Sequence, residues 1–300
     1  MLSGRAMLAT AVQAGYIENE LNYMIGVLPF FHILATMIFH VTIQRGFGLV
    51  ILPRFDPETF LRAVEKYQIE LLSLAPPIVQ FLAKHPIVAK YDLSKVQYIG
   101  TGGSALPLDV EDLVHKRLGV TVMQGYGMTE FAGPIAYPTS TQFRPGSTGL
   151  LMPNTDLKIK DLDTDKDVGV NEVGELLFRS PSAMNGYFKD EEANRVAFAE
   201  DGFIRTGDVG YIDADGYVYI VDRLKEMIKY KGHQVSPVEL DDVLSSHPAM
   251  DEACCVRGQD SQSREEIPKA YVVLHEGSTV TADELIAYVG SKVAGYKKVR

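Results

Sequence analysis

The sequence predicts a mixed α/β fold in three parts: a parallel-sheet α/β subdomain, a small antiparallel β-barrel subdomain and a small α+β C-terminal domain. Three observations carry this prediction. Apolar runs alternate with amphipathic helical runs from Gly48 to Gly125, short alternating strands with turn signals follow Gly133, and a basic segment opens a third regime at Arg223. We therefore place a domain boundary at about Asp222. The expected units are residues 1–222, divided into 1–140 and 141–222, and a mobile domain of residues 223–300.

The α/β part follows from its alternating elements. Asp56 and Pro57 supply an N-cap and a first-turn proline for a helix whose predicted apolar face holds Phe60, Leu61, Val64 and Tyr67. The other expected elements are strands at Leu49–Leu52, Leu71–Leu74, Val96–Ile99 and Val120–Met123, and helices at Pro77–Ala83 and Pro107–Leu118.

An uncharged stretch from Tyr23 to Ile43 has the length of a membrane span. Pro29 and His32 interrupt it, several polar side chains would lie at bilayer depth, and a soluble-type buried strand follows at Arg45–Pro53. A buried core segment is therefore favoured, and no transmembrane span is expected.

The sequence predicts shorter elements in the β-barrel subdomain and in the C-terminal domain. Antiparallel strands are expected at Leu157–Lys160, Glu175–Arg179 and Tyr217–Val221. In the last part, strands are expected near Ala253–Val256 and Ala270–Leu274, and two helices open at the capping boxes Ser236–Glu239 and Thr281–Glu284.

Composition bounds the function. The chain of 300 residues has 29 Lys and Arg against 39 Asp and Glu, a formal charge of −10, and it is globular by its 46% hydrophobic content. An acidic balance disfavours a nucleic-acid partner. The adjacent Cys254 and Cys255 match no zinc spacing and indicate a reducing compartment.

Two glycine-rich turns follow neighbouring predicted strands, Gly100–Ser104 and Gly125–Glu130. Parallel sheets bind ligands at the carboxyl ends of their strands, so a nucleotide-sized site is expected there. Glycines let backbone amides approach a phosphate or a ring, Thr129 can donate to a phosphate oxygen, and Glu130 can hold Mg²⁺. A purely structural turn is the alternative, and the motif is not the dinucleotide fingerprint, because Glu130 replaces its third glycine.

Three further motifs have alternative interpretations. Ser104 resembles the nucleophile of a hydrolase elbow, but Leu106 replaces the last glycine, so a turn lining a ligand is favoured. The carboxylates between Asp161 and Glu172 have calcium-loop spacing, but Lys166 replaces the required glycine, which favours an acidic solvated hairpin. His32 taken alone is a core histidine.

A third group of candidates lies near the predicted domain boundary. Asp208 can accept from both hydroxyls of a ribose, and Arg223 can support ribose or phosphate from the other side. The run Arg223–Gly232 also holds Lys225, Lys229 and Lys231 against one acid, a local charge of +3. A solvated helix face and capture of an anionic ligand between domains explain this run equally well.

Read in order, five motifs resemble those of adenylate-forming enzymes, the acyl-CoA synthetase and firefly luciferase superfamily, with 4-coumarate:CoA ligase as the most similar branch. These motifs are Leu28–His32, Gly102–Ser104, Gln124–Glu130, Thr206–Tyr211 and Val221–Gly232. The resemblance implies the corresponding fold and an ATP-dependent ligase. In its first step a carboxylic acid attacks ATP to give an acyl-adenylate; in its second step CoA forms the thioester.

The resemblance also assigns expected roles. Gly102, Gly103 and Ser104 would line adenine, Tyr126 would stack on it, Thr129 would bind the α-phosphate and Glu130 would hold Mg²⁺. Asp208 and Arg223 would contact the nucleotide, Lys225 would lie at the hinge, and Lys229, Lys231 and Gly232 would lie near ATP or CoA. The acyl pocket would be bordered by His32, Gln124, Gly125 and Met128.

Two family motifs are missing from the sequence: the Ser/Thr/Gly-rich phosphate loop and the late Gly-Lys motif. Lys297 and Lys298 do not replace the latter, because they precede its expected place and lack its glycine. We therefore expect an incomplete ligase with weak or no activity, cytoplasmic or peroxisomal. The alternative hypothesis is a non-catalytic module that binds acyl-adenylate or CoA.

Overall fold

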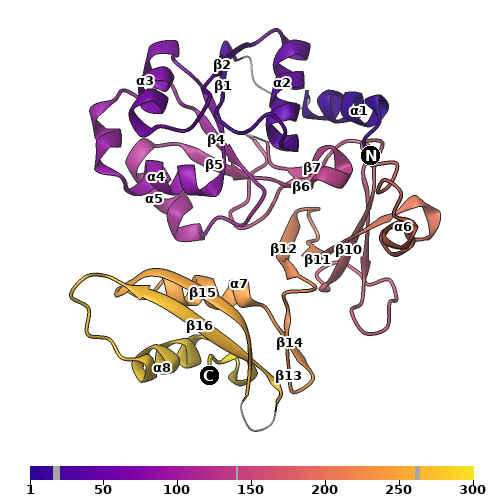
Figure 1. The fold of residues 1–300 in the computed structure, drawn as a ribbon, viewed down its shortest axis with the longest axis vertical. Coiled ribbons are helices and arrows are strands. Elements are labelled where there is room, and N and C mark those ends of the chain that lie inside the picture. The colour runs from indigo at the N-terminus through magenta and orange to yellow at the C-terminus, as the bar shows by residue number, and fades with distance from the viewer. Residues whose placement is uncertain (16–20, 140, 261–263) are drawn as a thin grey trace.

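A five-stranded parallel sheet organises the first part of the chain (Figure 1). The computed structural model describes residues 1–15, 21–139, 141–260 and 264–300. The strand order is β2-β1-β3-β4-β5, and every pairing is parallel. The strands are β1 (Tyr23–Gly26), β2 (Gly48–Ile51), β3 (Leu71–Leu74), β4 (Tyr98–Thr101) and β5 (Thr121–Gln124). The predicted alternation of strands and helices is confirmed, with β4 displaced by two residues from its expected range.

Helices connect and cover these strands: α1 (Gly4–Ala14), α2 (Ile33–Arg45), α3 (Pro57–Tyr67), α4 (Pro76–Lys84), η1 (Pro86–Lys90) and α5 (Leu108–Leu118). Asp56 caps α3 by accepting from the Thr59 amide at 2.9 Å. Phe60 and Leu61 are fully buried in the main core. Tyr67 was expected on the same face but is 37% exposed, and its ring packs on Tyr23 at the end of the helix.

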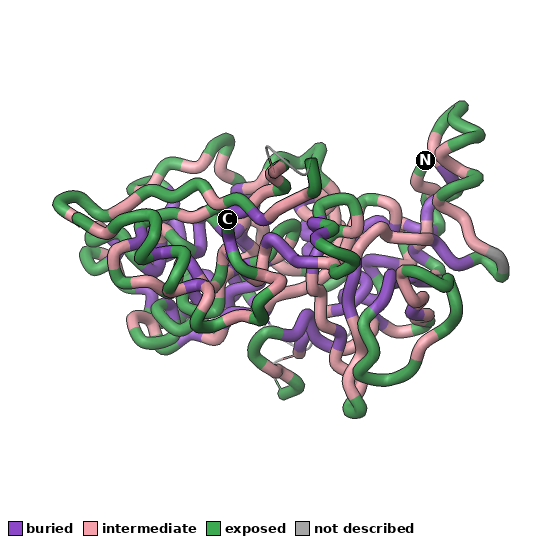
Figure 2. Tube along the Cα trace, turned by 90° about the horizontal axis from the view of Figure 1, so that it is seen from below, coloured by how far each residue is buried: buried purple, intermediate pink, exposed green. Residues whose placement is uncertain are grey.

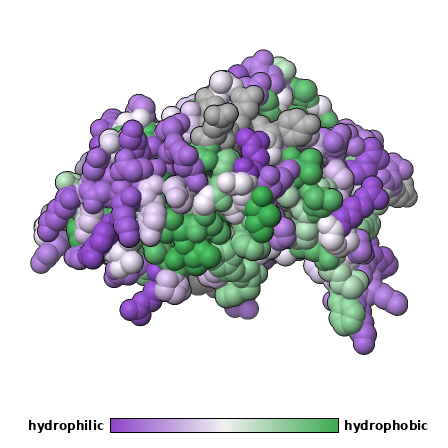
Figure 3. Space-filling view, turned by 90° about the horizontal axis from the view of Figure 1, so that it is seen from above, coloured by the Kyte–Doolittle hydropathy of each residue, from purple (hydrophilic) through white to green (hydrophobic). Residues whose placement is uncertain are grey.

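The uncharged stretch Tyr23–Ile43 divides between β1 and α2 rather than forming one continuous segment. The prediction that this stretch is a buried core segment is confirmed only in part, because α2 leaves Phe39 and Ile43 exposed. Apolar side chains gather near the middle of the upper face (Figure 3). Within the described residues, no helix is long and apolar enough to cross a membrane.

Antiparallel strands make up the second part. One sheet has the order β6-β7-β8 and the other β12-β11-β10-β9, and a bridge between Leu150 and Tyr217 joins them. The elements are β6 (Tyr126–Met128), η2 (Thr129–Phe131), β7 (Gly133–Tyr137), β8 (Leu150–Leu151), β9 (Asp156–Lys160), β10 (Gly174–Arg179), α6 (Glu191–Ala197), η3 (Glu200–Gly202), β11 (Ile204–Ile212) and β12 (Val218–Arg223). Both strand orders are linear, so the described strands form two connected sheets where a barrel was expected.

The acidic hairpin in this part has structural partners. Asp165 pairs with Arg205 and Asp167 pairs with Lys160. Among the described residues, no group of three or more His, Cys, Asp or Glu side chains is arranged to hold a metal ion. The two ion pairs support the acidic-hairpin interpretation.

The last part has its own hydrophobic core, built from residues between Ile228 and Val299. Its elements are β13 (Ile228–Tyr230), β14 (His233–Val235), α7 (Pro237–Ser245), β15 (Met250–Gln259), β16 (Glu266–Leu274), α8 (Ala282–Lys292) and η4 (Gly295–Lys297). In Figure 2, buried chain lies inside each part of the molecule and exposed chain at its loops.

The two predicted capping boxes differ in outcome. Thr281 and Glu284 form the complete box at α8. Ser236 caps α7, but the Glu239 carboxylate instead accepts two hydrogen bonds from Lys297 Nζ at 2.6 and 2.8 Å. A nearby lysine therefore replaces the backbone N–H as the partner of Glu239.

The basic run Arg223–Gly232 is not a helix face. After a turn it forms the hairpin β13–β14, whose two loop residues, Lys231 and Gly232, have φ of 48° and 78°. Positive φ at both loop residues is typical of a tight type I′ hairpin turn. The charges of this run are therefore spread along a turn and a hairpin.

Candidate functional site

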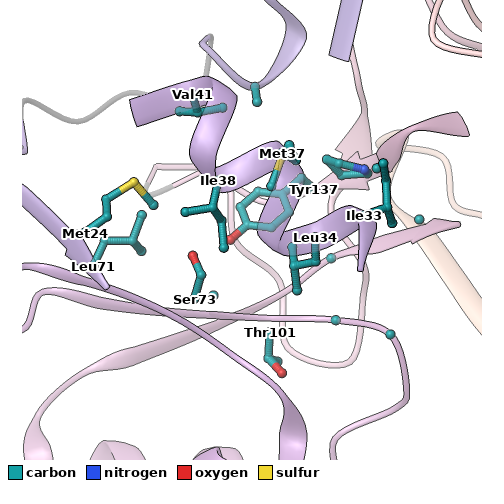
Figure 4. Close-up of a pocket in the computed structure, with 18 of the residues that line it drawn as sticks. Met24, Ile33, Leu34, Met37, Ile38, Val41, Leu71, Ser73, Thr101 and Tyr137 are labelled. Carbon is teal, nitrogen blue, oxygen red and sulfur yellow. The ribbon is translucent and has the colours of Figure 1, made fainter. Parts of the chain in front are cut away.

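An apolar cavity of about 120 Å³ lies where α2 crosses the carboxyl ends of β3, β4 and β5. Figure 4 shows Met24, Leu34, Ile38 and Leu71 around it, with the Ser73 hydroxyl directed inward. An engineered apolar cavity of roughly 150 Å³ accepts benzene, so this one suits a compact apolar group.

The glycines at the strand ends make room for Tyr137. A Cβ on Gly100 would collide with the Tyr137 hydroxyl, and a Cβ on Gly125 would collide with the Tyr137 ring. Burial raises the pKa of Tyr137 to about 12, so its phenol is neutral in the cavity wall. Gly100 and Gly125 thus have a packing reason that the sequence pattern does not reveal.

The loop after β4 forms the mouth of the cavity. Gly102 and Gly103 line it, and Gly103 has φ of 90°, a conformation that favours glycine. Ser104 is exposed. Its loop lines the cavity through Gly102 and Gly103, which agrees with the interpretation of a turn that lines a ligand.

Asp208 and Arg223 are directly opposite each other on β11 and β12. The Asp208 carboxylate accepts from the Tyr126 hydroxyl at 2.5 Å and lies 3.6 Å from Arg223 Nε. Burial raises the pKa of Asp208, while the Tyr126 hydroxyl and the Arg223 guanidinium oppose this shift. The expected nucleotide contacts Tyr126, Asp208 and Arg223 thus meet at one place, and Tyr126 also lines the cavity.

Thr129 and Glu130 follow β6 in the short helix η2. Thr129 is exposed, and the Glu130 carboxylate accepts from the Tyr187 hydroxyl at 2.8 Å. Burial, together with this carboxylate, raises the pKa of Tyr187 to about 12. Mg²⁺ in nucleotide sites is commonly held by one or two carboxylates plus phosphates and water, which Glu130 fits.

Three of the four residues expected at the acyl pocket line the cavity: His32, Gly125 and Met128. Gln124 departs from the expectation. Its side-chain oxygen accepts from the Leu106 amide at 2.8 Å, and its amide nitrogen donates to Glu111 at 3.2 Å. The side chain is therefore engaged between the loop after β4 and helix α5.

The basic candidates lie apart from this cluster. In Figure 1 the β13–β14 hairpin, which carries Lys229, Lys231 and Gly232, lies at the opposite end of the view from the parallel sheet. Lys225 is exposed, and its backbone carbonyl accepts from Arg257 at 2.8 Å. This arrangement does not bring these lysines to the cavity.

Three residues of the site region belong to no motif of the sequence: Glu111, Tyr137 and Tyr187. Each makes its contact across a long separation in the chain, as Tyr187 does with Glu130. A local pattern carries no signal for such partners. The one available signal was for Tyr137, which follows the Gly125–Glu130 turn closely in the sequence.

The glycine-rich loops and the Tyr126–Asp208–Arg223 cluster lie near the carboxyl edge of the parallel sheet, where α/β folds commonly bind ligands. The AMP-binding enzyme family matches residues 1–188, and the AMP-binding enzyme C-terminal domain matches residues 239–300. The chain belongs to the AMP-binding enzyme family. This result confirms the resemblance to adenylate-forming enzymes.

Among similar proteins, the chain is 39% identical to probable 4-coumarate–CoA ligase 1 of Dictyostelium discoideum, over all of this chain and 54% of that protein. It is also 39% identical to luciferin 4-monooxygenase of Photinus pyralis, over 92% of this chain and 50% of that protein. The chain therefore spans about half the length of the curated relatives it matches.

Solved structures agree on the fold. The amide bond synthetase McbA from Marinactinospora thermotolerans has a TM-score of 0.90 and 29% identity, covering 100% of this chain and 60% of its own. The o-succinylbenzoate coenzyme A synthetase from Bacillus subtilis, in complex with ATP and magnesium ion, has a TM-score of 0.86 and 28% identity, covering 99% and 61%. The predicted fold class, that of adenylate-forming enzymes in part, is confirmed.

Proposed function

We propose that this chain contributes the nucleotide and acyl sites of an ATP-dependent carboxylic acid:CoA ligase of the 4-coumarate:CoA ligase type. The observation that carries the proposal is the meeting of Tyr126, Asp208 and Arg223 beside the glycine-lined mouth of an apolar cavity. A nucleotide held at the cluster would present its phosphate to a carboxylate whose apolar remainder fills the cavity.

Each side chain then has a physical task. Asp208 accepts from the ribose hydroxyls, Arg223 supports the same nucleotide, and the Tyr126 ring stacks on adenine. Thr129 is exposed and free to donate to the α-phosphate. Glu130 holds Mg²⁺, which neutralises phosphate charge and orients the phosphates when it is bound.

The acyl group occupies the cavity between α2 and the strand ends, with His32 and Met128 in its wall. Its apolar lining favours an aryl or aliphatic acid over a polar one. CoA enters with the small domain, which we delimit at about residue 222 because the residues after it build a separate core. Lys229, Lys231 and Gly232 act at that stage, after movement of this domain.

The Ser/Thr/Gly-rich phosphate loop and the Gly-Lys motif of the resembled family do not occur among these 300 residues. Binding by this chain, rather than turnover, is therefore the direct test.

Isothermal titration with AMP and with a non-hydrolysable acyl-adenylate analogue is the experiment. We expect one saturable site for each ligand, with the analogue binding more tightly because it also fills the cavity. Pyrophosphate release with ATP, Mg²⁺ and a panel of aryl and aliphatic acids then measures residual chemistry. Absence of binding by both ligands would contradict the proposal.

A further inference from the structure

A buried carboxyl outside the proposed site holds one of its loops through an intermediate side chain. Glu111 lies on α5 and is 9% exposed. Its Oε1 accepts from Gln124 Nε2 at 3.2 Å, and Gln124 Oε1 accepts from the Leu106 amide at 2.8 Å. The chain of contacts runs from helix α5, through the end of β5, to the loop after β4.

The chemistry of these groups fixes the direction of the Gln124 amide. Above its pKa of about 7 the Glu111 carboxylate is ionised and has only acceptors, so it selects the NH₂ group of Gln124. The oxygen of the same amide is then turned toward the Leu106 N–H. An amide in the reverse orientation would present a donor to the Leu106 donor and an acceptor to the Glu111 carboxylate, which breaks both contacts.

The loop held in this way carries the proposed adenine-lining residues. Gly102 and Gly103 precede Leu106 by a few residues, and Gly103 has the flexible backbone of a glycine at positive φ. On the other side, the Gly125 amide donates to the Thr101 carbonyl at 2.9 Å. The two glycine-rich loops are therefore tied together at their bases by one backbone contact and by the Gln124 side chain.

We propose that Glu111 is a positioning residue for nucleotide binding, which acts by orienting Gln124 so that Gln124 fixes the Gly102–Leu106 loop. This role rests on the proposed function, because it assumes that the loop contacts adenine. Glu111 itself touches neither nucleotide nor acyl group. Its unusual environment agrees with such a role, since burial raises its pKa to about 7.

The test is AMP titration of four variants of the full chain, each checked for cooperative unfolding in urea. Glu111→Leu removes the acceptor, and we expect its Kd for AMP to rise about fivefold or more. Gln124→Glu keeps the acceptor for Leu106 but removes the donor to Glu111, and we expect a similar loss. Asp112→Asn changes an exposed acid on the same turn of α5 and is the matched control, expected to bind AMP like the wild type.

The decisive variant is the exchanged pair, Glu111→Gln with Gln124→Glu. Glu at position 124 can accept from both the Leu106 amide and the new Gln side chain at 111, so the contact chain is rebuilt with donor and acceptor reversed. We expect AMP affinity within about twofold of the wild type. A role of Glu111 in fold stability alone would change urea unfolding and leave the Kd for AMP of the folded variants unchanged.

The outcomes separate the two proposals. If the wild type binds AMP and Glu111→Leu binds it equally well, only the role of Glu111 is overturned. The same holds if the exchanged pair binds AMP as weakly as Gln124→Glu. No AMP binding by the folded wild type overturns the proposed function, and the role of Glu111 with it.

Discussion

Replacement of Asp208 by Ala is the most informative change in the proposed nucleotide site. The Asp208 side chain is 13% exposed, its Oδ2 accepts from Tyr126 and its Oδ1 lies 3.6 Å from Arg223 Nε. Each oxygen of a carboxylate has further acceptor capacity, which suits the two ribose hydroxyls. Losing these bonds costs about 1.5 to 3 kcal/mol, which corresponds to a Kd for AMP roughly 10- to 150-fold higher.

Isothermal titration of the wild type and Asp208→Ala with AMP measures this loss. Asp163→Asn, an exposed aspartate on the acidic hairpin, is the matched control and should leave the Kd unchanged. Tyr126→Phe removes only the hydroxyl that bonds to Asp208 and retains the ring, so it should lose less affinity than Asp208→Ala. An Asp208→Ala chain that is folded and binds AMP within about twofold of the wild type would refute the assignment.

Three further predictions test other parts of the account. Since burial raises the folded pKa of Glu111 to about 7 from 4.5, the wild type loses stability as pH rises from about 4.5 to above 7. At pH 8 the free energy of unfolding of Glu111→Gln in urea should therefore exceed that of the wild type by about 1 to 3 kcal/mol, and near pH 4 the two values should be equal. A difference that stays constant between pH 4 and pH 8 would contradict the raised pKa of Glu111. Gly125→Ala should destabilise the chain by about 1 to 3 kcal/mol because its Cβ meets Tyr137, and the double variant with Tyr137→Ala should lose less stability than the sum of the two single changes; simple additivity in thermal unfolding would show that the two do not clash. Mg²⁺ should tighten ATP binding to the wild type but not to Glu130→Gln, and an equal response to EDTA in both chains would exclude Glu130 as the ligand.

The order of elements was predictable because it depends on local chemistry. Asp56 and Pro57 begin α3 as expected, and apolar runs mark the buried strands β3 and β5. The site was predictable to the extent that it consists of loops at strand ends. Asp208 and Arg223 were expected at the same nucleotide, and the register of β11 on β12 places them opposite each other.

What was not predictable depends on tertiary partners. Glu239 has the spacing of a capping box, but its carboxylate accepts a hydrogen bond from Lys297, which is far along the chain. Gln124 sits in a motif expected at the acyl pocket, yet the Leu106 amide and Glu111 draw its side chain away. The basic run reads as a helix face by charge, whereas its Lys231–Gly232 pair adopts a hairpin turn. In the first two cases a partner outside the local motif decides the contact, and in the third the backbone of a two-residue turn decides the conformation.

Amide hydrogen exchange with and without saturating AMP locates the nucleotide on the chain. We expect slower exchange in two segments, Gly102–Leu106 and Tyr126–Glu130, and in the strand around Asp208. Protection confined to other segments, or none at saturation, would contradict a nucleotide site at the carboxyl edge of the parallel sheet.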